Sequence, residues 1–193
     1  MKGVISIGAN VGQEFEQWVN EGYENFMFFE PVQSTYMKLH QIMSHRTDYN
    51  ITLYNLAIGN TEGEITMNTE TSHQGKSCSI LNPKLHLHHY PDIIFDKTEL
   101  VKINKLDNII YNRENYDFLH IDTQGYELEV LKGAIDSLTF IEKIQVEVYR
   151  AELYKGCPRM LDVTDFLWEK GFEVMEVKWL GLAWGDCYLR RRK

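Results

Sequence analysis

The chain has 193 residues, 44% of them hydrophobic, and a formal net charge of −8 at pH 7. This length fits one globular domain with a sizeable core, so we expect residues 1–193 to form a single domain. The acidic balance argues against nucleic acid as a partner, because a phosphate backbone is usually bound by a basic face.

The first part of the chain alternates between strand-like and helix-like patterns. These segments lie, in chain order, at residues 4–7, 12–21, 26–29, 32–43 and 51–57. Their patterns predict strand, helix, strand, helix and strand, which is the βαβαβ arrangement of a parallel sheet. The glycines and polar residues at 59–63 then predict a hairpin.

The segment from about residue 69 to residue 99 loses this periodicity and is rich in histidine, with interspersed glycine and proline. Long irregular segments inside a compact domain usually have a function. We therefore expect a lid-like insertion that shapes the pocket of an acceptor substrate.

Regular patterns return in the second half of the chain. They predict strands at 118–121 and 144–148, helices at 126–134 and 160–170, and two closing strands near 172–177 and 183–189. Short apolar runs separated by helices indicate an α/β fold with a mostly parallel sheet and helices on both faces. The two closing strands predict an antiparallel hairpin at one edge of the sheet.

The cysteines and the apolar runs bear on the location of the protein. Cys78, Cys157 and Cys187 are widely separated and form no C-x-x-C pair, which suggests neither a disulfide framework nor a zinc ribbon. No apolar run approaches the roughly 18–20 residues of a membrane span, and the first residues lack a signal-peptide pattern. We expect a cytoplasmic protein with no membrane span.

The opening stretch VISIGANVGQEF, residues 4–15, predicts a strand-to-helix turn that holds a ligand. Gly8 permits a sharp turn, Gly12 permits a close approach, and the N–H groups at a helix start favour a negative group. The spacing is not G-x-G-x-x-G, so packing alone is an alternative explanation. Glu30 ends the next strand, where an acid can accept hydrogen bonds from both ribose hydroxyls. The alternative for Glu30 is an acid at a helix start, before Pro31.

Seven blocks of the sequence resemble the FkbM-type methyltransferases, in order and in spacing. They are ISIGANVGQ, FFEP, LYNLAIGNTEGEI, SCSIL, KLDNII, YDFLHIDTQGYELEVLKGA and IQVEVY, between about residues 4 and 172. Two positions depart from the family pattern, because Ser6 stands where an acid is common and His120 where a lysine is usual. The chain also starts almost on its first strand, which is typical of either a domain trimmed from a larger protein or a minimal member.

The resemblance implies a Rossmann-like class I methyltransferase sheet with S-adenosylmethionine as the cofactor. The methionine part of the cofactor would lie near the first turn and its ribose on the acid of the second strand. The implied cofactor-binding residues are Gly8, Asn10, Gly12, Gln13 and Glu30.

Asp122 is the first candidate for catalysis, because it ends the strand that the resemblance places beside the transferred methyl group. It would act as a base, or bind a divalent cation such as Mg²⁺ or Mn²⁺ that acidifies the acceptor hydroxyl. The alternative is a cap for the helix near residue 126. Glu147 is the second carboxylate, although it also fits a single polar position on a strand. Glu127 is explained by the helix dipole alone.

The histidines of LHLHHYP, residues 85–91, are further candidates. His86 and His88 lie two residues apart and would point the same way in an extended chain, but no other ligand pair supports a metal site. Together with Tyr90 they suit a sugar ring, and we take His88 as a candidate general base.

The function expected from these features is O-methylation, dependent on S-adenosylmethionine, of a hydroxyl on a sugar, glycan or natural-product acceptor. One alternative is an NAD-dependent oxidoreductase, against which stand the glycine spacing and the absence of an evident substrate domain. The other is a catalytically inactive binding module with the same fold, which would have no need of Asp122.

Overall fold

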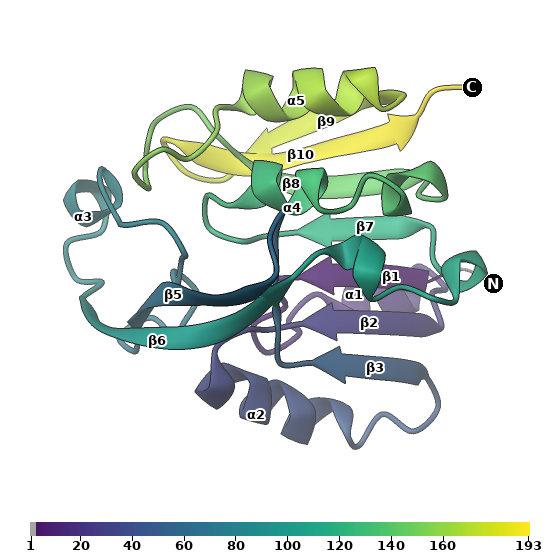
Figure 1. Cartoon of the computed structure of the whole chain (residues 1–193), viewed down its shortest axis with the longest axis horizontal. Helices are drawn as coiled ribbons and strands as arrows, with labels where there is room; N and C mark the ends of the chain where they lie inside the picture. Colours follow the sequence, from purple (N-terminus) through teal and green to yellow (C-terminus); the bar gives the residue numbers. More distant parts are fainter. Residues whose placement is uncertain (1–2) are drawn as a thin grey trace.

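The computed structural model describes residues 3–193, which form one large and one small β-sheet (Figure 1). The strands of the large sheet are β1 (Gly3–Ile7), β2 (Asn25–Phe29), β3 (Asn50–Tyr54), β7 (Phe118–Ile121), β8 (Lys143–Tyr149), β9 (Phe172–Trp179) and β10 (Trp184–Arg191). Their order in space is β3-β2-β1-β7-β8-β10-β9.

The large sheet is parallel except for β10, which runs antiparallel to both of its neighbours. The chain crosses from β8 to β9 and leaves one strand position open, and β10 then fills it. This arrangement confirms the prediction of a mostly parallel sheet with an antiparallel C-terminal hairpin.

The small sheet corrects two predictions. Its strands are β4 (Ala57–Ile58), β5 (Gly63–Glu70) and β6 (Phe95–Asn104), in the order β4-β6-β5. Because β6 lies between the other two, the hairpin predicted around residues 59–63 is wrong. The irregular part is also shorter than the predicted 69–99, and we refer to residues 71–94 as the 71–94 segment. It contains one short helix, α3 (His86–His89).

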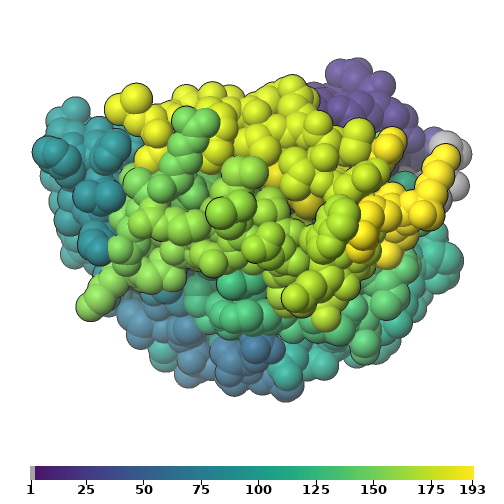
Figure 2. All heavy atoms as spheres, turned by 90° about the horizontal axis from the view of Figure 1, so that it is seen from above, coloured from purple at the N-terminus to yellow at the C-terminus, as the bar shows by residue number. Residues whose placement is uncertain are grey.

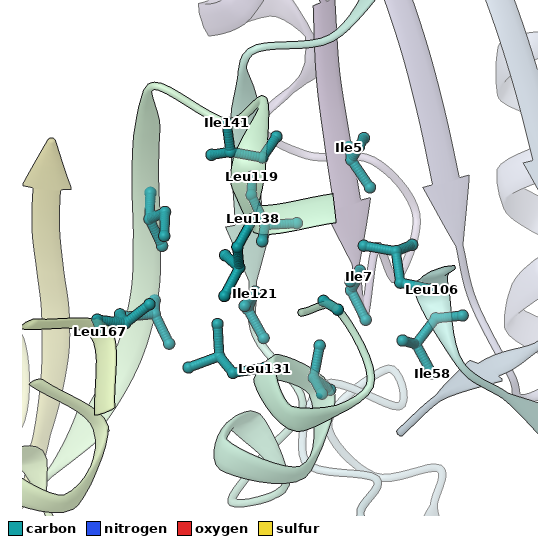
Figure 3. Close-up of a cluster of buried hydrophobic side chains, with 14 of the residues drawn as sticks. Ile5, Ile7, Ile58, Leu106, Leu119, Ile121, Leu131, Leu138, Ile141 and Leu167 are labelled. Carbon is teal, nitrogen blue, oxygen red and sulfur yellow. The ribbon is translucent and has the colours of Figure 1, made fainter. Parts of the chain in front are cut away.

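Helices cover both faces of the large sheet, as predicted. They are α1 (Phe15–Asn20), α2 (Gln33–Met43), α4 (Glu127–Lys132) and α5 (Met160–Glu169). On one face, Leu39 and Met43 of α2 and Trp18 of α1 pack on Phe26 and Phe28 of β2. Side chains of α4 and α5 pack on alternate residues of the central strands at the other face, in the cluster drawn in Figure 3. The alternation of core contacts follows from the two-residue period of a strand.

The first helix begins three residues later than its pattern indicates, at Phe15 rather than at residue 12. Asn10 and Gly12 have positive φ angles of 46° and 77°, which a right-handed helix does not allow. The turn between β1 and α1 is therefore a longer loop. Its backbone N–H groups bond outside the helix, those of Gly8 and Ala9 to the Phe29 carbonyl and that of Asn10 to the Glu30 carboxyl group.

The carboxyl ends of the parallel strands define the functional edge of the sheet. In Figure 1 the arrowheads of β1, β2, β3 and β7 point toward the side on which β5, β6 and α3 lie. In Figure 2 the teal residues of the 71–94 region form the left end of the molecule, beside yellow C-terminal residues. Among residues 3–193, no helix is long and apolar enough to cross a membrane.

Candidate active site

A cavity of about 390 Å³ lies at the carboxyl ends of β1, β2, β7 and β8. Its lining includes Gly8 after β1, Glu30 after β2, Asp122 after β7 and Glu147 in β8. Ligands bind at this edge in open α/β sheets, because the loops there diverge and leave a crevice. The structure thus brings together four of the predicted residues from distant parts of the sequence.

Gly8 is required by the close approach of two strand ends. Its φ angle is +79°, and a Cβ atom there would lie 1.8 Å from the carbonyl oxygen of Asp122. Gly12 has a different role, because a Cβ atom there would lie 2.3 Å from Met43 Cε, and Gly12 is not part of the cavity lining. Glycine is favoured at this position by its φ angle of +77°, and it faces α2 rather than a ligand, whereas Asn10 and Gln13 do line the cavity.

Glu30 is a buried carboxyl group with backbone donors only. Its Oε2 accepts a hydrogen bond from the Asn10 N–H at 3.0 Å, and its Oε1 accepts one from the Val32 N–H at 2.9 Å. Burial raises the pKa of Glu30 to about 8, although these two bonds act in the opposite direction. Each oxygen retains a further acceptor site, which the hydroxyls of a ribose would fill.

Asn10 supplies a second group that fits a ligand. Its Oδ1 is buried and has no hydrogen-bond partner within residues 3–193, while its Nδ2 donates to the Gln74 carbonyl at 3.3 Å. An unpaired buried acceptor is costly unless a ligand donates to it. Asn10 and Glu30 together therefore fit the donor groups of S-adenosylmethionine, its ammonium and its ribose hydroxyls.

Gln124 joins the two candidate catalytic carboxylates. Its Nε2 donates to Asp122 Oδ1 at 2.7 Å and to Glu147 Oε2 at 2.9 Å. Its own Oε1 accepts from the Tyr154 hydroxyl at 2.7 Å, and its φ angle is 55°, in the left-handed region. The hydroxyl of Tyr149 also donates to Glu147. The pair is thus held in place by donors from Gln124 and Tyr149.

The two carboxyl groups differ in how readily they ionise. Burial raises the pKa of Asp122 to about 6, and the bond from Gln124 limits the rise. Burial and the nearby charges of Asp122 and Glu127 raise the pKa of Glu147 well above its usual range. Asp122 is therefore the carboxylate and Glu147 the protonated partner near neutral pH, which gives them separate roles.

Asp122 is not the cap of the helix that follows it. The turn before α4 is closed by Glu127, whose Oε1 accepts from the N–H groups of Thr123 at 3.1 Å and Gly125 at 3.0 Å. Glu127 is fully buried and performs this structural task. The capping alternative for Asp122 therefore loses its main support.

The structure does not bring His88 to the cavity. His88 is exposed, and its ring lies beside His89 with centroids 6.2 Å apart. His86 and His88 would point the same way only in an extended chain, but these residues form a helical turn, in which residues two apart point about 200° apart. His86 instead is buried and lines the cavity, with an Nδ1 atom that has no partner in the described part of the chain.

A divalent cation at Asp122 is not supported. Across residues 3–193 no group of three or more histidine, cysteine, aspartate or glutamate side chains is placed to hold a metal ion. The amide of Gln124 also stands between Asp122 and Glu147 and donates to the oxygens that a cation would need.

The two departures from the family pattern face each other. Ser6 and His120 are paired residues of β1 and β7, both are buried, and Ser6 Oγ lies 3.1 Å from His120 Nδ1. Burial lowers the pKa of His120 to about 4, so the pair is neutral. One neutral pair therefore occupies the positions where the family commonly has an acid and a lysine.

Sequence reasoning missed Gln124, Glu14 and Asp186, which also line the cavity. Asp186 lies in β10 directly opposite Glu147 in β8. Asp186 reaches this position only because β10 inserts beside β8. The sequence predicted the closing strands only as an edge hairpin, so it gave no sign that Asp186 would lie at the cavity. Burial, together with the charges of Asp122 and Asp186, raises the pKa of Glu14 to about 7.

These pKa shifts predict how the stability of the ligand-free protein depends on pH. Glu14, Glu30 and Glu127 have pKa values of about 7, 8 and 7 in the fold against an ordinary value of 4.5. Such groups stabilise the fold below the unfolded pKa, and this stability is lost as the pH rises through the folded pKa. The pKa values of His86 and His120 are lowered from 6.5 to about 4, so these groups stabilise the fold as the pH rises. That stabilisation is already complete above pH 6.5 and does not change over the range considered.

We therefore expect the melting temperature to fall by roughly 5 °C or more between pH 6.5 and about pH 9. Calorimetric melts of the ligand-free protein at constant ionic strength measure this. A melting temperature that stays level or rises over that range would contradict the assignment of these carboxyl groups as buried and protonated.

The strand order, the reversed β10 and the ligand cavity at the carboxyl ends define the Rossmann-like fold of methyltransferases that depend on S-adenosylmethionine. The chain belongs to the methyltransferase FkbM domain family, which it matches over residues 6–174. It is therefore a methyltransferase dependent on S-adenosylmethionine, and the oxidoreductase alternative is set aside.

Individual relatives agree with this assignment. The chain is 27% identical over 198 residues to the 2-O-methyltransferase NoeI of Sinorhizobium fredii (strain NBRC 101917 / NGR234), and the match covers 98% of this chain and 79% of the relative. The solved methyltransferase FkbM from Methylobacillus flagellatus KT has the same fold, with a TM-score of 0.67 at 17% identity. That match covers 98% of this chain and 43% of the solved one. The chain thus spans less than half of that protein.

A methyltransferase solved with its cofactor also shares the fold. Magnesium protoporphyrin IX methyltransferase (ChlM) from Synechocystis PCC 6803, with bound SAM, matches with a TM-score of 0.55 at 9% identity. The match covers 98% of this chain and 71% of that one. At this identity the likeness concerns the fold alone.

Proposed function

We propose that this enzyme transfers a methyl group from S-adenosylmethionine to a hydroxyl oxygen of a sugar, or of a natural product with a similar polar ring. The observation that carries the proposal is one cavity that contains both Glu30, with its free acceptor sites, and the Asp122–Glu147 pair. The first suits an adenosine-containing cofactor, and the second suits removal of a hydroxyl proton.

The cofactor half of the cavity extends from the first turn to the small sheet. Glu30 would accept hydrogen bonds from the ribose, and Asn10 Oδ1 would accept one from the ammonium of the methionine part. Gly8 has no side chain, so the cofactor could contact the backbone there. When bound, S-adenosylmethionine supplies an electrophilic methyl group, and the remaining task of the protein is alignment and proton removal.

Asp122 is proposed as the base. The acceptor oxygen forms a bond to the methyl carbon while the carbon–sulfur bond breaks, and the hydroxyl proton passes to the Asp122 carboxylate. Gln124 orients Asp122 by its hydrogen bond, and Glu147, which holds its own proton, leaves Asp122 as the single charged member of the pair.

The acceptor half of the cavity supports a sugar substrate. Tyr90, Tyr149 and Trp184 line it, and the Trp184 Nε1–H donates to the Tyr90 hydroxyl at 2.8 Å, which fixes both rings. Aromatic faces pack on the C–H faces of sugar rings, while carboxyl and amide groups bind the hydroxyls. The name of the relative NoeI, a 2-O-methyltransferase, agrees with oxygen as the methylated atom.

The three cysteines are free thiols, which suits a reducing compartment such as the cytoplasm.

The test is methyl transfer from S-adenosylmethionine carrying a ¹³C-labelled methyl group to a panel of neutral methyl glycosides. A labelled methyl signal at the chemical shift of an O-methyl ether, appearing with an equal amount of demethylated cofactor, supports the proposal. Labelled product on nitrogen or carbon, or no product across glycosides and polyhydroxylated natural products, would contradict it.

The 71–94 segment is proposed as the lid of the single domain. Its residues His73, Ser77, His86 and Tyr90 line the cavity, which supports a role in closing over the reacting groups. Methyl transfer needs the sulfonium protected from water, and lid closure achieves this in many enzymes. We expect backbone hydrogen exchange in this segment to slow when cofactor and acceptor are both added. Exchange that is equal in the free, binary and ternary states would show that the segment is a passive loop.

A further inference from the structure

The side chains that line the acceptor half of the cavity are mostly acidic rather than basic. The carboxyl groups of Glu14, Asp122, Glu147 and Asp186 line it, in addition to Glu30 in the cofactor half. Of the described residues in the lining, Lys76 alone has a permanently positive side chain, and it is exposed. No arginine is part of that lining, so nothing in it resembles a clamp for a carboxylate, phosphate or sulfate group.

His86 is an independent sign that a polar ligand enters this half. It is 3% exposed, and its ring packs among Tyr90, Phe95 and Tyr154 with centroids 5.0–5.3 Å apart. Its backbone is fixed by the hydrogen bond from its N–H to the Leu153 carbonyl at 3.0 Å. Nevertheless its Nδ1 has no partner within residues 3–193. A ring held so firmly with an unpaired nitrogen fits a ligand hydroxyl.

Asp186 is an acid of this half that has no basic hydrogen-bond partner. Its carboxylate accepts a hydrogen bond from Gln145 Nε2 at 3.1 Å, and it lies opposite Glu147 in the neighbouring strand. Lys178, paired with Asp186 across β9 and β10, instead has its ammonium 3.4 Å from Glu176. Asp186 therefore faces the cavity with a neutral donor as its hydrogen-bond partner.

The geometry points to an acceptor subsite, between His86 and Asp186, that takes uncharged or positively charged sugars and rejects sugars bearing a carboxylate, phosphate or sulfate. This inference rests on the proposed function, because it specifies the substrate class of the same site. An anionic group would meet the Asp122 carboxylate in a partly desolvated space whose lining has no arginine and has only the exposed Lys76 as a permanent cation. An ammonium group would instead donate hydrogen bonds to the carboxyl groups of this half.

A matched set of acceptors isolates charge from shape. Methyl glucoside, its 6-amino-6-deoxy analogue and methyl glucuronide share the ring hydroxyls and differ at one carbon, and the same three forms exist for galactose and mannose. We expect kcat/KM for the carboxylate members to be at least about 100-fold below that of the neutral or amino members of the same set. The formation of demethylated cofactor measures this.

The outcomes separate the two proposals. Turnover of a carboxylate member equal to or above that of its neutral counterpart overturns the charge selection and leaves the sugar O-methyltransferase intact. Turnover of no member of any set removes the sugar proposal and the charge selection with it. Turnover limited to neutral and amino members supports both.

Two variants test the named residues. Asp186→Asn should reduce the ratio of kcat/KM between the neutral and the carboxylate members about tenfold. Asp165→Asn, which removes an exposed charge on α5, should leave this ratio unchanged. His86→Phe keeps an aromatic ring but removes both nitrogens, and it should raise KM for the neutral member about tenfold, with partial recovery in His86→Asn. An unchanged ratio in Asp186→Asn, or an unchanged KM in His86→Phe, would overturn the corresponding assignment.

Discussion

Asn in place of Asp122 is expected to lower the rate of methyl transfer by roughly 10²–10⁴-fold, the usual cost of losing a positioned base. The side chain keeps nearly the same shape, and its Oδ1 can still accept the hydrogen bond that Gln124 Nε2 makes at 2.7 Å. Affinity for the cofactor should barely change, because the proposed cofactor contacts are made by Asn10 and Glu30. Turnover under saturating S-adenosylmethionine, together with a calorimetric cofactor titration, measures both quantities.

Two controls accompany this substitution. Asp136→Asn changes an exposed acid that is distant in sequence from the β7 turn, and its turnover should match the parent. The kcat/KM of the parent should also fall as the pH falls through about 6, the pKa of Asp122 in the free protein, because the base becomes protonated. Parental turnover in Asp122→Asn would refute the catalytic assignment, since a purely structural aspartate tolerates asparagine.

Gln in place of Glu30 is expected to weaken binding of S-adenosylmethionine and of its demethylated product by about 100-fold or more. A hydrogen bond to a charged group contributes roughly 1.5–3 kcal/mol. The variant also places its amide N–H₂ group against one of the two backbone N–H groups that donate to the carboxylate in the parent. Isothermal titration calorimetry measures the affinity directly. The matched control is Glu24→Gln, which changes an exposed acid just before β2.

Proton release gives this prediction a second readout. The pKa of Glu30 in the free protein is about 8, and ribose hydroxyls donate to the ionised form. Cofactor binding near pH 7 should therefore release a proton, which appears as a dependence of the measured heat on the ionisation enthalpy of the buffer. Unchanged affinity in Glu30→Gln, with no buffer dependence in the parent, would remove Glu30 from the cofactor site.

The central strands β1, β2, β7 and β8 were predictable because nearly all of their residues are buried. Such strands appear in the sequence as short apolar runs, and β7 spans Phe118–Ile121 as predicted. The strand β6 (Phe95–Asn104) escaped prediction because half of its side chains face solvent, so that FDKTELVKIN carries no long apolar run. Its partner β5 is exposed at Gly63, Glu64 and Thr66 and becomes buried only toward its end, at Met67, Thr69 and Glu70.

The residues of the candidate site also fall into those that the sequence predicted and those that it did not. Glu30 and Asp122 directly follow their strands, so the rule that ligands bind at carboxyl ends was sufficient to select them. Gln124 and Asp186 depend on a left-handed turn and on the insertion of β10, which only the folded chain reveals. His88 was predicted as the candidate base because the sequence does not show which histidine of α3 is turned toward the cavity, and the structure places His86 there.

The central claim is that one cavity holds the cofactor on Glu30 with its sulfur directed at Asp122. The most direct measurement is a crystal structure with S-adenosylhomocysteine and a neutral methyl glycoside. The account predicts ribose hydroxyls within hydrogen-bond distance of the Glu30 carboxylate, an ammonium near Asn10 Oδ1, and a sugar hydroxyl between the sulfur and the Asp122 carboxylate. A cofactor bound with its ribose away from Glu30, or a sugar bound outside the cavity that His86 and Asp186 line, would contradict it.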